Sequence, residues 1–332
     1  MGRVITRGRL RLNHWVVLGS SVTGASHIRV ASGNQDAIGF APENGRGSRV
    51  AIATADGHGS PKSFRSSEGS RLAVRASLAL AAEFIEADAK GVPLALVKSR
   101  LEGDAPLRLV RTWRTSVDED LAHHPLAPAE LDGLEASSGP AARKLVELDP
   151  YLAYGATLLG GVVGESFAVL WQLGDGDIVA VDENGGARRL VPKDDRLIAN
   201  ETTSLCSKEA WHHFRVVFDA SPDPLMLLST DGLANSFTND AGFLKFGVDL
   251  GRMISSEGVP VVESRMKGWL RQMSDQGSGD DISVLAVFRA DPPRFVGAAP
   301  SGGIARTLKT RALRIRIHPS LPGGRHNVRA QR

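Results

Sequence analysis

The chain has 332 residues, 42% of them hydrophobic, which allows a large core in one or two domains. Its formal net charge of +3 is unevenly placed: residues 301–332 carry eight Lys or Arg and no acid, which leaves the rest of the chain at −5. The basic character therefore belongs to a tail and says little about what the body binds. No run approaches the roughly 18 apolar residues of a membrane span, so we expect no membrane-spanning helix and a soluble protein.

Cysteine usage indicates the compartment. Cys206 is the only cysteine, so no intrachain disulfide can form, which is typical of a reducing environment. The apolar segment WVVLG that follows the basic N-terminus is too short for the hydrophobic region of a signal peptide. We therefore expect a cytoplasmic protein with no membrane partner.

The first half of the chain predicts strands followed by helices. Apolar runs indicate strands at residues 14–20, 36–41 and 49–55. An apolar stripe from Leu72 to Ile85 predicts a helix, and a weaker helical pattern continues over residues 92–122. Residues 124–148 are rich in Pro, Ala, Gly and Ser and predict a loop or a loosely held insertion.

The second half returns to strands. Runs at 155–163, 166–173 and 177–182 are separated by Gly-containing turns, which predicts an antiparallel meander. Further along, the pattern predicts a strand at 224–230, a helix at 261–275 and a strand at 282–288. Two clusters of strands, each followed by helices, favour an α+β fold with antiparallel sheet over a parallel βαβ winding.

Three parts of the chain differ in composition. We expect an N-terminal extension at 1–12, a globular body at 13–290 and a basic tail of low order at 291–332. The tail segment ARTLKTRALRIRI alternates basic and apolar residues, as a nucleic-acid-binding segment could. It has no aromatic residue to stack on a base, so a disordered basic end is the simpler interpretation and nucleic acid is not an expected partner.

Acidic residues stand where apolar strands meet Gly-rich turns. They are Asp36, Asp56, Asp231 and the pair Asp280 and Asp281. Each alone is explained by the preference of Asp and Gly for turns. Together they suggest a joint role, because buried like charges repel one another unless a cation neutralises them. Carboxylates with a backbone carbonyl suit Mg²⁺ or Mn²⁺ and not zinc.

Several motifs carry a resemblance to a known family. In chain order they are SVTGASHIRVASGNQDA, ADGHGS with SSEGSRLAV after it, YGATLL, LGDGDIVAVD, ANETTSL, LLSTDGLANSF and GSGDDISVL. The chain resembles the metal-dependent Ser/Thr protein phosphatases of the type 2C (PPM) family, particularly their bacterial branch, from about Trp15 to Phe288. The resemblance implies two antiparallel β-sheets packed as a sandwich and flanked by helices, and makes the body at 13–290 a phosphatase domain.

The resemblance also implies a centre of two Mn²⁺ or Mg²⁺ ions. Asp56 matches the carboxylate that bridges both metals, and Gly57 matches the glycine whose carbonyl binds the second. Asp231 matches a ligand of the first metal. In the last motif Asp280 takes the ligand role and Asp281 stands where the family usually has Asn.

The implied reaction is hydrolysis of phosphoserine or phosphothreonine in proteins. The attacking group would be a metal-bridging hydroxide, in line with the departing Ser or Thr oxygen. His58 matches the histidine proposed as general acid in relatives that keep Asp-Gly-His-Gly. Asp36 is included among the expected metal ligands. The expected partners are phosphorylated proteins, in opposition to a Ser/Thr kinase.

Two positions depart from the family pattern. Gln35 stands where many relatives have a Glu that contributes to the second metal site, and Ala31 stands where they have a phosphate-binding Arg. Arg29 would share the face of Ala31 on a strand and is the candidate for phosphate binding, with a solvent-exposed Arg as the other interpretation. His27, in the matched segment, either orients the strand of Asp36 or reaches the site.

These departures motivate an alternative function. A pseudophosphatase, or a regulatory module that binds phosphoproteins with weak turnover, would keep the fold and lose part of the site. Against it, Asp56, Asp231, Asp280 and His58 are all present, and a nearly complete site favours an enzyme.

Overall fold

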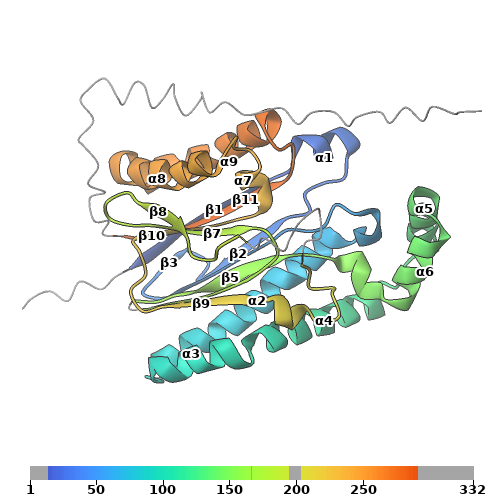
Figure 1. The fold of residues 1–332 in the computed structure, drawn as a ribbon, viewed down its shortest axis with the longest axis horizontal. Helices are drawn as coiled ribbons and strands as arrows, with labels where there is room; N and C mark the ends of the chain where they lie inside the picture. The colour runs from blue at the N-terminus through green and yellow to red at the C-terminus, as the bar shows by residue number, and fades with distance from the viewer. Residues whose placement is uncertain (1–13, 166, 194–202, 291–332) are drawn as a thin grey trace, which may run out of the picture.

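The computed structural model describes residues 14–165, 167–193 and 203–290 (Figure 1). The strands are β1 (Trp15–Val22), β2 (Ala37–Ala41), β3 (Arg46–Gly47), β4 (Val50–Ala55), β5 (Leu158–Val163), β6 (Ala168–Leu173), β7 (Asp177–Val181), β8 (Ala187–Arg189), β9 (Arg215–Asp219), β10 (Leu225–Ser229) and β11 (Ile282–Arg289). The α-helices are α1 (Ala25–Val30), α2 (Ser66–Ala89), α3 (Leu94–Gly103), α4 (Ala105–His123), α5 (Pro128–Ser138), α6 (Pro140–Leu148), α7 (Asp231–Ala234), α8 (Asp240–Glu257) and α9 (Val259–Gln276).

The predicted division into three parts stays a prediction. The expected extension at 1–12 and the expected tail at 291–332 lie outside the described residues. So does the first part of the ANETTSL motif. Within the described ranges, no helix is long and apolar enough to cross a membrane.

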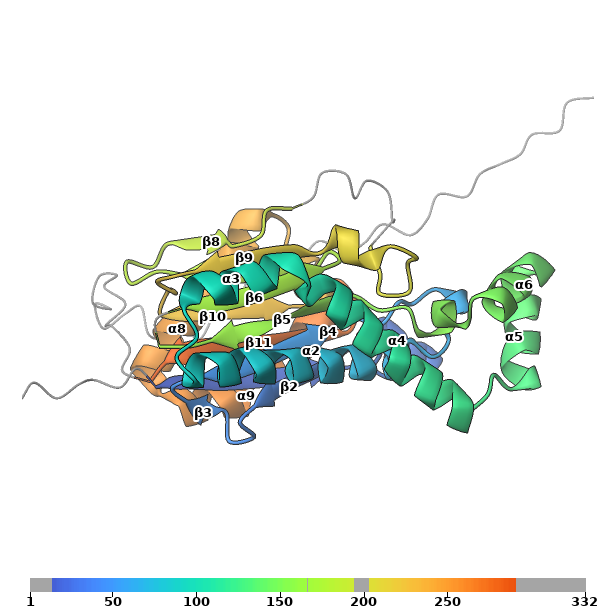
Figure 2. The same cartoon turned by 90° about the horizontal axis from the view of Figure 1, so that it is seen from below.

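Two antiparallel sheets form the centre of the molecule. One has the strand order β3-β1-β11-β10-β7-β8 and the other β2-β4-β5-β6-β9. Figure 1 shows α8 and α9 over the first sheet, and α2 and α4 under the second are seen from below in Figure 2. The predicted fold class, two antiparallel sheets packed as a sandwich and flanked by helices, is confirmed.

Alternation along the strands explains the layers. In β1, Val16 and Leu18 join the core under α8 and α9, whereas Trp15 and Val17 join the core between the sheets. Successive side chains of a strand point to opposite faces, so a strand buried on both faces is apolar throughout. This is why the strands appear in the sequence as continuous apolar runs.

Strand register brings distant acidic turns to one end of the sandwich. Ser229 at the end of β10 pairs with Val284 near the start of β11. In the other sheet, Ala37 at the start of β2 pairs with Ala55 at the end of β4. The turns that follow β10 and β4 therefore lie beside the turns that precede β11 and β2.

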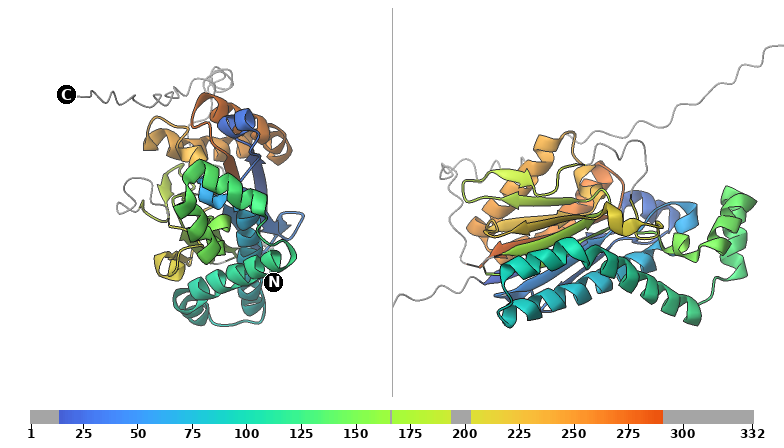
Figure 3. Two further views of the ribbon diagram at one scale, coloured as in Figure 1. Left: turned by 90° about the vertical axis from the view of Figure 1, so that its right-hand side faces the viewer. Right: turned by 60° about the horizontal axis from the view of Figure 1, so that its bottom comes forward.

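The predicted loop at 124–148 is wrong, because this segment forms α5 and α6. Pro128 and Pro140 lie in the first turns of these helices, where a backbone N–H has no intrahelical partner, so they start helices there and do not break them. Leu134 and Val146 are buried. The two helices extend beyond the sheets at one end of the molecule (Figures 2 and 3).

A side-chain contact fastens this helical pair to the body. Arg65 bonds Glu130 of α5 (Nη2–Oε2 2.6 Å) and donates to the carbonyl of His124 (2.6 Å) and of Pro125 (3.0 Å). The segment is therefore held in place, and the interpretation as a loosely held insertion is also wrong.

The predicted meander is wrong in its third strand. β5 and β6 pair as expected, but β7 crosses to the other sheet and pairs with β10 and β8. The crossing occurs at the Gly174-Asp175-Gly176 turn, where Gly174 has φ +102°. A Cβ on Gly174 would also lie 2.6 Å from the side chain of Thr157, so only glycine fits the turn.

Candidate active site

Four carboxylates from four strand ends gather at one end of the sandwich. Asp36 directly precedes β2, Asp56 directly follows β4, Asp231 begins α7 and Asp280 lies two residues before β11. Asp56 and Asp231 lie close enough to share a proton, which adds to the raised pKa of Asp56 and partly offsets the rise in that of Asp231. The structure thus brings together the acids that the sequence predicted as one site.

Burial and mutual repulsion perturb these acids. Burial raises the pKa of Asp231 to about 6, and it raises the pKa values of Asp36 and Asp56 well above their ordinary range. The pKa of Asp280 is raised as well, mainly by burial. Neighbouring carboxylates add to each of these shifts. Without a cation, the folded protein therefore holds protons at this site that exposed carboxylates would release.

Thr230 connects the two sheets beneath the carboxylates. Its hydroxyl, fully buried, donates to Oδ2 of Asp36 (2.8 Å) and accepts from the backbone N–H of Ser283 (3.0 Å). The sequence reasoning missed this residue. The hydroxyl directly before Asp231 in LLSTDGL was the signal that could have found it.

The two adjacent acids of the last motif have different surroundings. Asp281 is buried, and its two carboxylate oxygens accept the backbone N–H groups of Gly24 and Gln35, each at 2.6 Å. Asp280 is 46% exposed at its side chain, and its Oδ1 accepts the N–H of Asp281 (2.9 Å). Asp281 therefore ties three segments together, whereas Asp280 faces the site.

His27 reaches the site. Its Nδ1 lies 2.9 Å from Oδ1 of Asp281, and its Nε2 lies 3.9 Å from Oδ1 of Asp280. The sequence left two roles open for this histidine, and the structure places it against the acidic pair. From α1 it lies beside a pair of residues that is more than 250 positions away in the sequence, and its Nδ1 is buried without a hydrogen bond of acceptable geometry.

The Asp-Gly-His-Gly turn packs closely. A Cβ on Gly57 would lie 2.6 Å from the carbonyl oxygen of Gln35 and 2.7 Å from that of Ser66, so a larger residue does not fit. The N–H of His58 donates to the carbonyl of Gly155 (3.0 Å). Burial lowers the pKa of His58, which the charge of Asp175 partly opposes.

Comparison with known proteins identifies the family. A sequence model described as protein phosphatase 2C matches residues 23–271, more than half of the chain. The chain belongs to the protein phosphatase 2C family. A search of curated proteins finds no match.

Solved structures give more distant likenesses. PppA, a key regulatory component of T6SS in Pseudomonas aeruginosa, is 18% identical, with 83% of this chain and 100% of that one covered and a TM-score of 0.49. The serine/threonine phosphatase of S. agalactiae is 17% identical over 83% and 99%, with a TM-score of 0.49. The catalytic domain of PstP, in complex with two manganese ions, is 16% identical over 84% and 99%, with a TM-score of 0.47.

In this phosphatase 2C chain, Arg29 does not lie on a strand, so that part of the prediction is wrong. It belongs to α1, and Ala31 ends the helix in a left-handed conformation (φ 55°, ψ 32°). On a helix, residues two apart point to different sides, so Arg29 does not take the place of Ala31. Its side chain is exposed, and its role in phosphate binding stays a prediction.

The donor chemistry of this phosphatase 2C site fits a hard cation. As the side chains stand, no group of three or more His, Cys, Asp or Glu within the described ranges is arranged to hold a metal ion. The gathered donors are nevertheless all oxygens, and both Oδ1 of Asp36 and Oε1 of Gln35 are buried without a hydrogen-bond partner. Mg²⁺ and Mn²⁺ prefer such oxygen donors.

Proposed function

We propose that this protein hydrolyses phosphoserine and phosphothreonine in proteins at a centre of two divalent cations. The observation that carries the proposal is the set of four mutually repelling carboxylates at the strand ends, since such a set is stable in its charged form only with a cation. Members of the phosphatase 2C family act on phosphoproteins and use Mn²⁺ or Mg²⁺.

The ligands in this proposal come from the same turns. Asp36, Asp56, Asp231 and Asp280 would hold the two ions, together with the carbonyl of Gly57. Bound there, the ions would lower the pKa of water and offset the charge of the phosphate.

Other side chains of the protein would hold the metal ligands in place and supply the proton that the leaving oxygen needs. His58, half-buried at the mouth of β4, would donate a proton to the departing Ser or Thr oxygen. His27 and Asp281 would hold Asp280 in place, because both contact it or its neighbour directly. Gln35 would supply a neutral oxygen in place of a carboxylate.

The biological setting follows from the proposed reaction. The substrates would be proteins phosphorylated by a Ser/Thr kinase, and the enzyme would then act in signal transduction. A cytoplasmic location is supported by the single, buried Cys206.

Phosphate release from a phosphothreonine peptide tests the proposal. We expect turnover with added Mn²⁺, loss of turnover with a chelator, and none in Asp56→Asn. An alternative, a module that binds phosphoproteins with weak turnover, is motivated by Gln35 at the second site. Tight peptide binding without metal-dependent release would favour that alternative and overturn the first proposal.

A further inference from the structure

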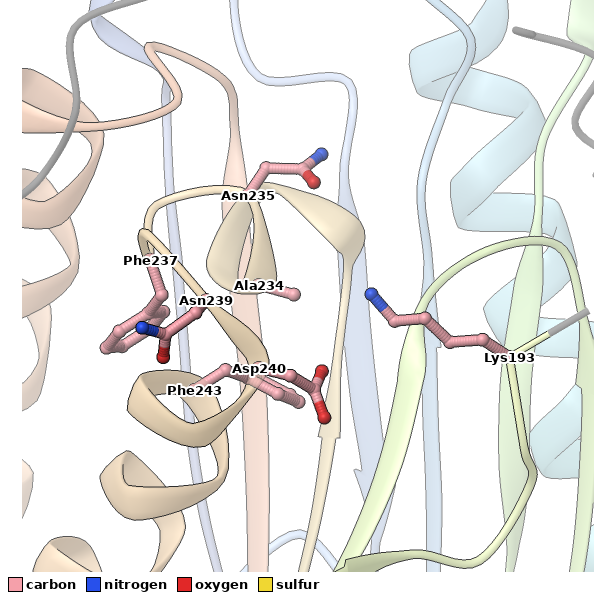
Figure 4. Close-up of a pocket in the computed structure, with 7 residues that line it drawn as sticks. All are labelled: Lys193, Ala234, Asn235, Phe237, Asn239, Asp240 and Phe243. Carbon is pink, nitrogen blue, oxygen red and sulfur yellow. The ribbon is translucent and has the colours of Figure 1, made fainter. Parts of the chain in front are cut away.

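A small pocket close to the carboxylates offers a ligand no net charge. It has a volume of about 260 Å³, and Figure 4 shows Lys193 on one side and Asn235 and Asp240 on the other. Arg189 bonds both Asp240 (2.5 Å) and the buried Asp177, and the charge of Lys193 also acts on Asp177. Two positive and two negative charges therefore offset one another, so this pocket does not select an ion.

An apolar face of α6 is exposed. Ala141, Leu145 and Leu148 follow one another at intervals of four and three residues, which puts them on one side of the helix. Leu145 is 50% exposed and Leu148 is 73% exposed, whereas Val146, between them in the sequence, is buried in the core. Within the described ranges no side chain covers the two leucines, so this α6 face is open to a partner.

The α6 face borders the proposed catalytic centre. A short 3-10 turn, Pro150–Tyr154, joins α6 to Gly155, and the carbonyl of Gly155 accepts the N–H of His58 (3.0 Å). In the other helix of the pair, Glu130 is bonded by Arg65, which follows His58 by seven residues. The left-hand view of Figure 3 shows both helices in front of this end of the sandwich. A segment docked on α6 would therefore lie close to the path of a protein substrate.

The surroundings of the α6 face are acidic. Residues 118–149, which include α5 and α6, carry eight Asp or Glu against two Lys or Arg. Lys62 and Arg65 in the adjoining turn add two positive charges, which leaves a net charge of −4. Even Arg143 of α6 is outnumbered, because its one guanidinium bonds three carboxylates at 2.7–3.0 Å, those of Asp132, Glu135 and Glu147. The partner that fits this face is therefore both apolar and basic.

A segment of the basic tail has this chemistry. Residues 305–317, ARTLKTRALRIRI, contain five Lys or Arg, four Leu or Ile and no acid. In extended form, Leu313, Ile315 and Ile317 would share one side, with the arginines between them on the other. Ile315 follows Ala290, where the described part of the chain ends, by 25 positions, and 25 extended residues span about 80 Å. Since β11 leads from the carboxylates to Ala290 in only eight residues, about 27 Å, the segment can reach α6.

We propose that residues 305–317 dock on the α6 face of the same molecule, with their Leu and Ile side chains on Leu145 and Leu148 and their arginines toward the surrounding acids. The local concentration of a segment tethered in this way is on the order of millimolar, so a weak contact is sufficient. The docked segment restricts the approach of phosphoproteins to the carboxylate centre, and this consequence rests on the proposed function. It leaves small phosphoesters unaffected.

Pairs of introduced cysteines test the docking in the full chain. Leu148→Cys with Ile315→Cys is compared with Leu96→Cys with Ile315→Cys, because Leu96 is an exposed leucine of α3 outside the α6 face. Cys206 is buried, so the introduced thiols are the ones that react with oxidised glutathione. We expect the intramolecular disulfide to form about fivefold faster or more in the Leu148 pair, since docking raises the local concentration of its partner. Equal rates in the two pairs, or a disulfide-linked dimer as the main product, would overturn the proposal.

Kinetics test the consequence separately. A variant with Arg311→Glu, Arg314→Glu and Arg316→Glu should release the segment, and Leu148→Ser should release it from the other side. If the segment is docked in about two-thirds of wild-type molecules, each variant lowers the KM for a phosphothreonine protein about threefold. Both variants should hydrolyse p-nitrophenyl phosphate like wild type with Mn²⁺, and Leu96→Ser, the control, should change neither activity.

The two experiments fail in different ways. If wild type hydrolyses no phosphoester, the proposed function fails, and the disulfide comparison still decides whether the segment docks. If the KM for the phosphothreonine protein is unchanged in both variants, or rises in Leu148→Ser because the α6 face binds the substrate itself, the role of the segment in restricting access is overturned.

Discussion

The adjacent acids Asp280 and Asp281 should respond differently to removal. Asp281→Ala leaves two N–H groups, the buried one of Gly24 and the partly buried one of Gln35, without their acceptor. Each unsatisfied buried group costs about 1–3 kcal/mol, so the variant should lose about 2–6 kcal/mol of unfolding free energy. Asp281→Asn keeps one oxygen acceptor and should recover roughly half of that loss.

Asp280→Ala is the matched comparison. Burial and neighbouring carboxylates raise the pKa of Asp280, so its charge destabilises the metal-free fold and its removal should leave stability unchanged or higher. Urea unfolding with a chelator measures both variants, and phosphate release with Mn²⁺ should show that Asp280→Ala is inactive. If Asp281→Ala were as stable as wild type, or if Asp280→Ala lost more stability than Asp281→Ala, the assignment of Asp281 to structural support and of Asp280 to metal binding would be refuted.

Three further predictions concern packing, metal affinity and pH. Gly69→Ala should lower the free energy of unfolding in urea by several kcal/mol, because its Cβ would lie 1.8 Å from the carbonyl oxygen of Tyr154. Gly268→Ala has open space around it and should raise the free energy of unfolding by about 0.5–1 kcal/mol, so equal effects would contradict this reasoning. Gln35→Glu restores a carboxylate and should move the Mn²⁺ dependence of activity to lower concentration, and an unchanged midpoint would show that another group supplies the charge. Metal-free protein should lose stability as pH rises from about 4 to about 6, since the folded pKa of Asp231 is raised and the folded state binds the extra proton. Melting with a chelator should therefore show Asp231→Asn above wild type at pH 7 and level with it below pH 4, and a constant gap would count against the raised pKa.

The strand ends could be predicted because their signals are local. An apolar run followed by Asp and Gly contains both the buried strand and its turn within a few residues, as at Asp56 and Asp231. Local composition misled the prediction at 124–148, where Pro128 and Pro140 begin helices and do not mark a loop. Proline is favoured in the first turn of a helix and breaks a helix in its interior.

Contacts between distant segments could not be predicted. Asp281 accepts from Gly24 and Gln35 across 257 and 246 residues, and no local pattern records such a pairing. The crossing of β7 to the other sheet has the same origin, because Gly174 fits either a hairpin or a crossing, and β7 finds its pairing partner in the distant strand β10. The candidate metal ligands could thus be predicted from residue type. The residues that hold them in place could be identified only from the folded structure.

His58 gives the most direct test of mechanism. A general acid matters when the leaving oxygen needs a proton in the transition state, as a threonine alkoxide does and p-nitrophenolate does not. Burial lowers the pKa of His58, which makes its protonated form a stronger acid but leaves a smaller fraction of the imidazole protonated at neutral pH.

His58→Ala should therefore lose roughly 10²-fold in kcat on a phosphothreonine peptide, the low end of general-acid effects, and much less on p-nitrophenyl phosphate. The contrasting role is packing: the ring lies against Gly155, where a Cβ would come within 2.7 Å of its Cδ2. Damage to the turn would displace Asp56 and lower kcat on both substrates alike, because the hydrolysis of each needs the same nucleophile. His123→Ala, at an exposed histidine of α4, controls for loss of an imidazole elsewhere. With kcat measured at saturating Mn²⁺, unequal losses support proton donation by His58, and equal losses assign it to packing alone.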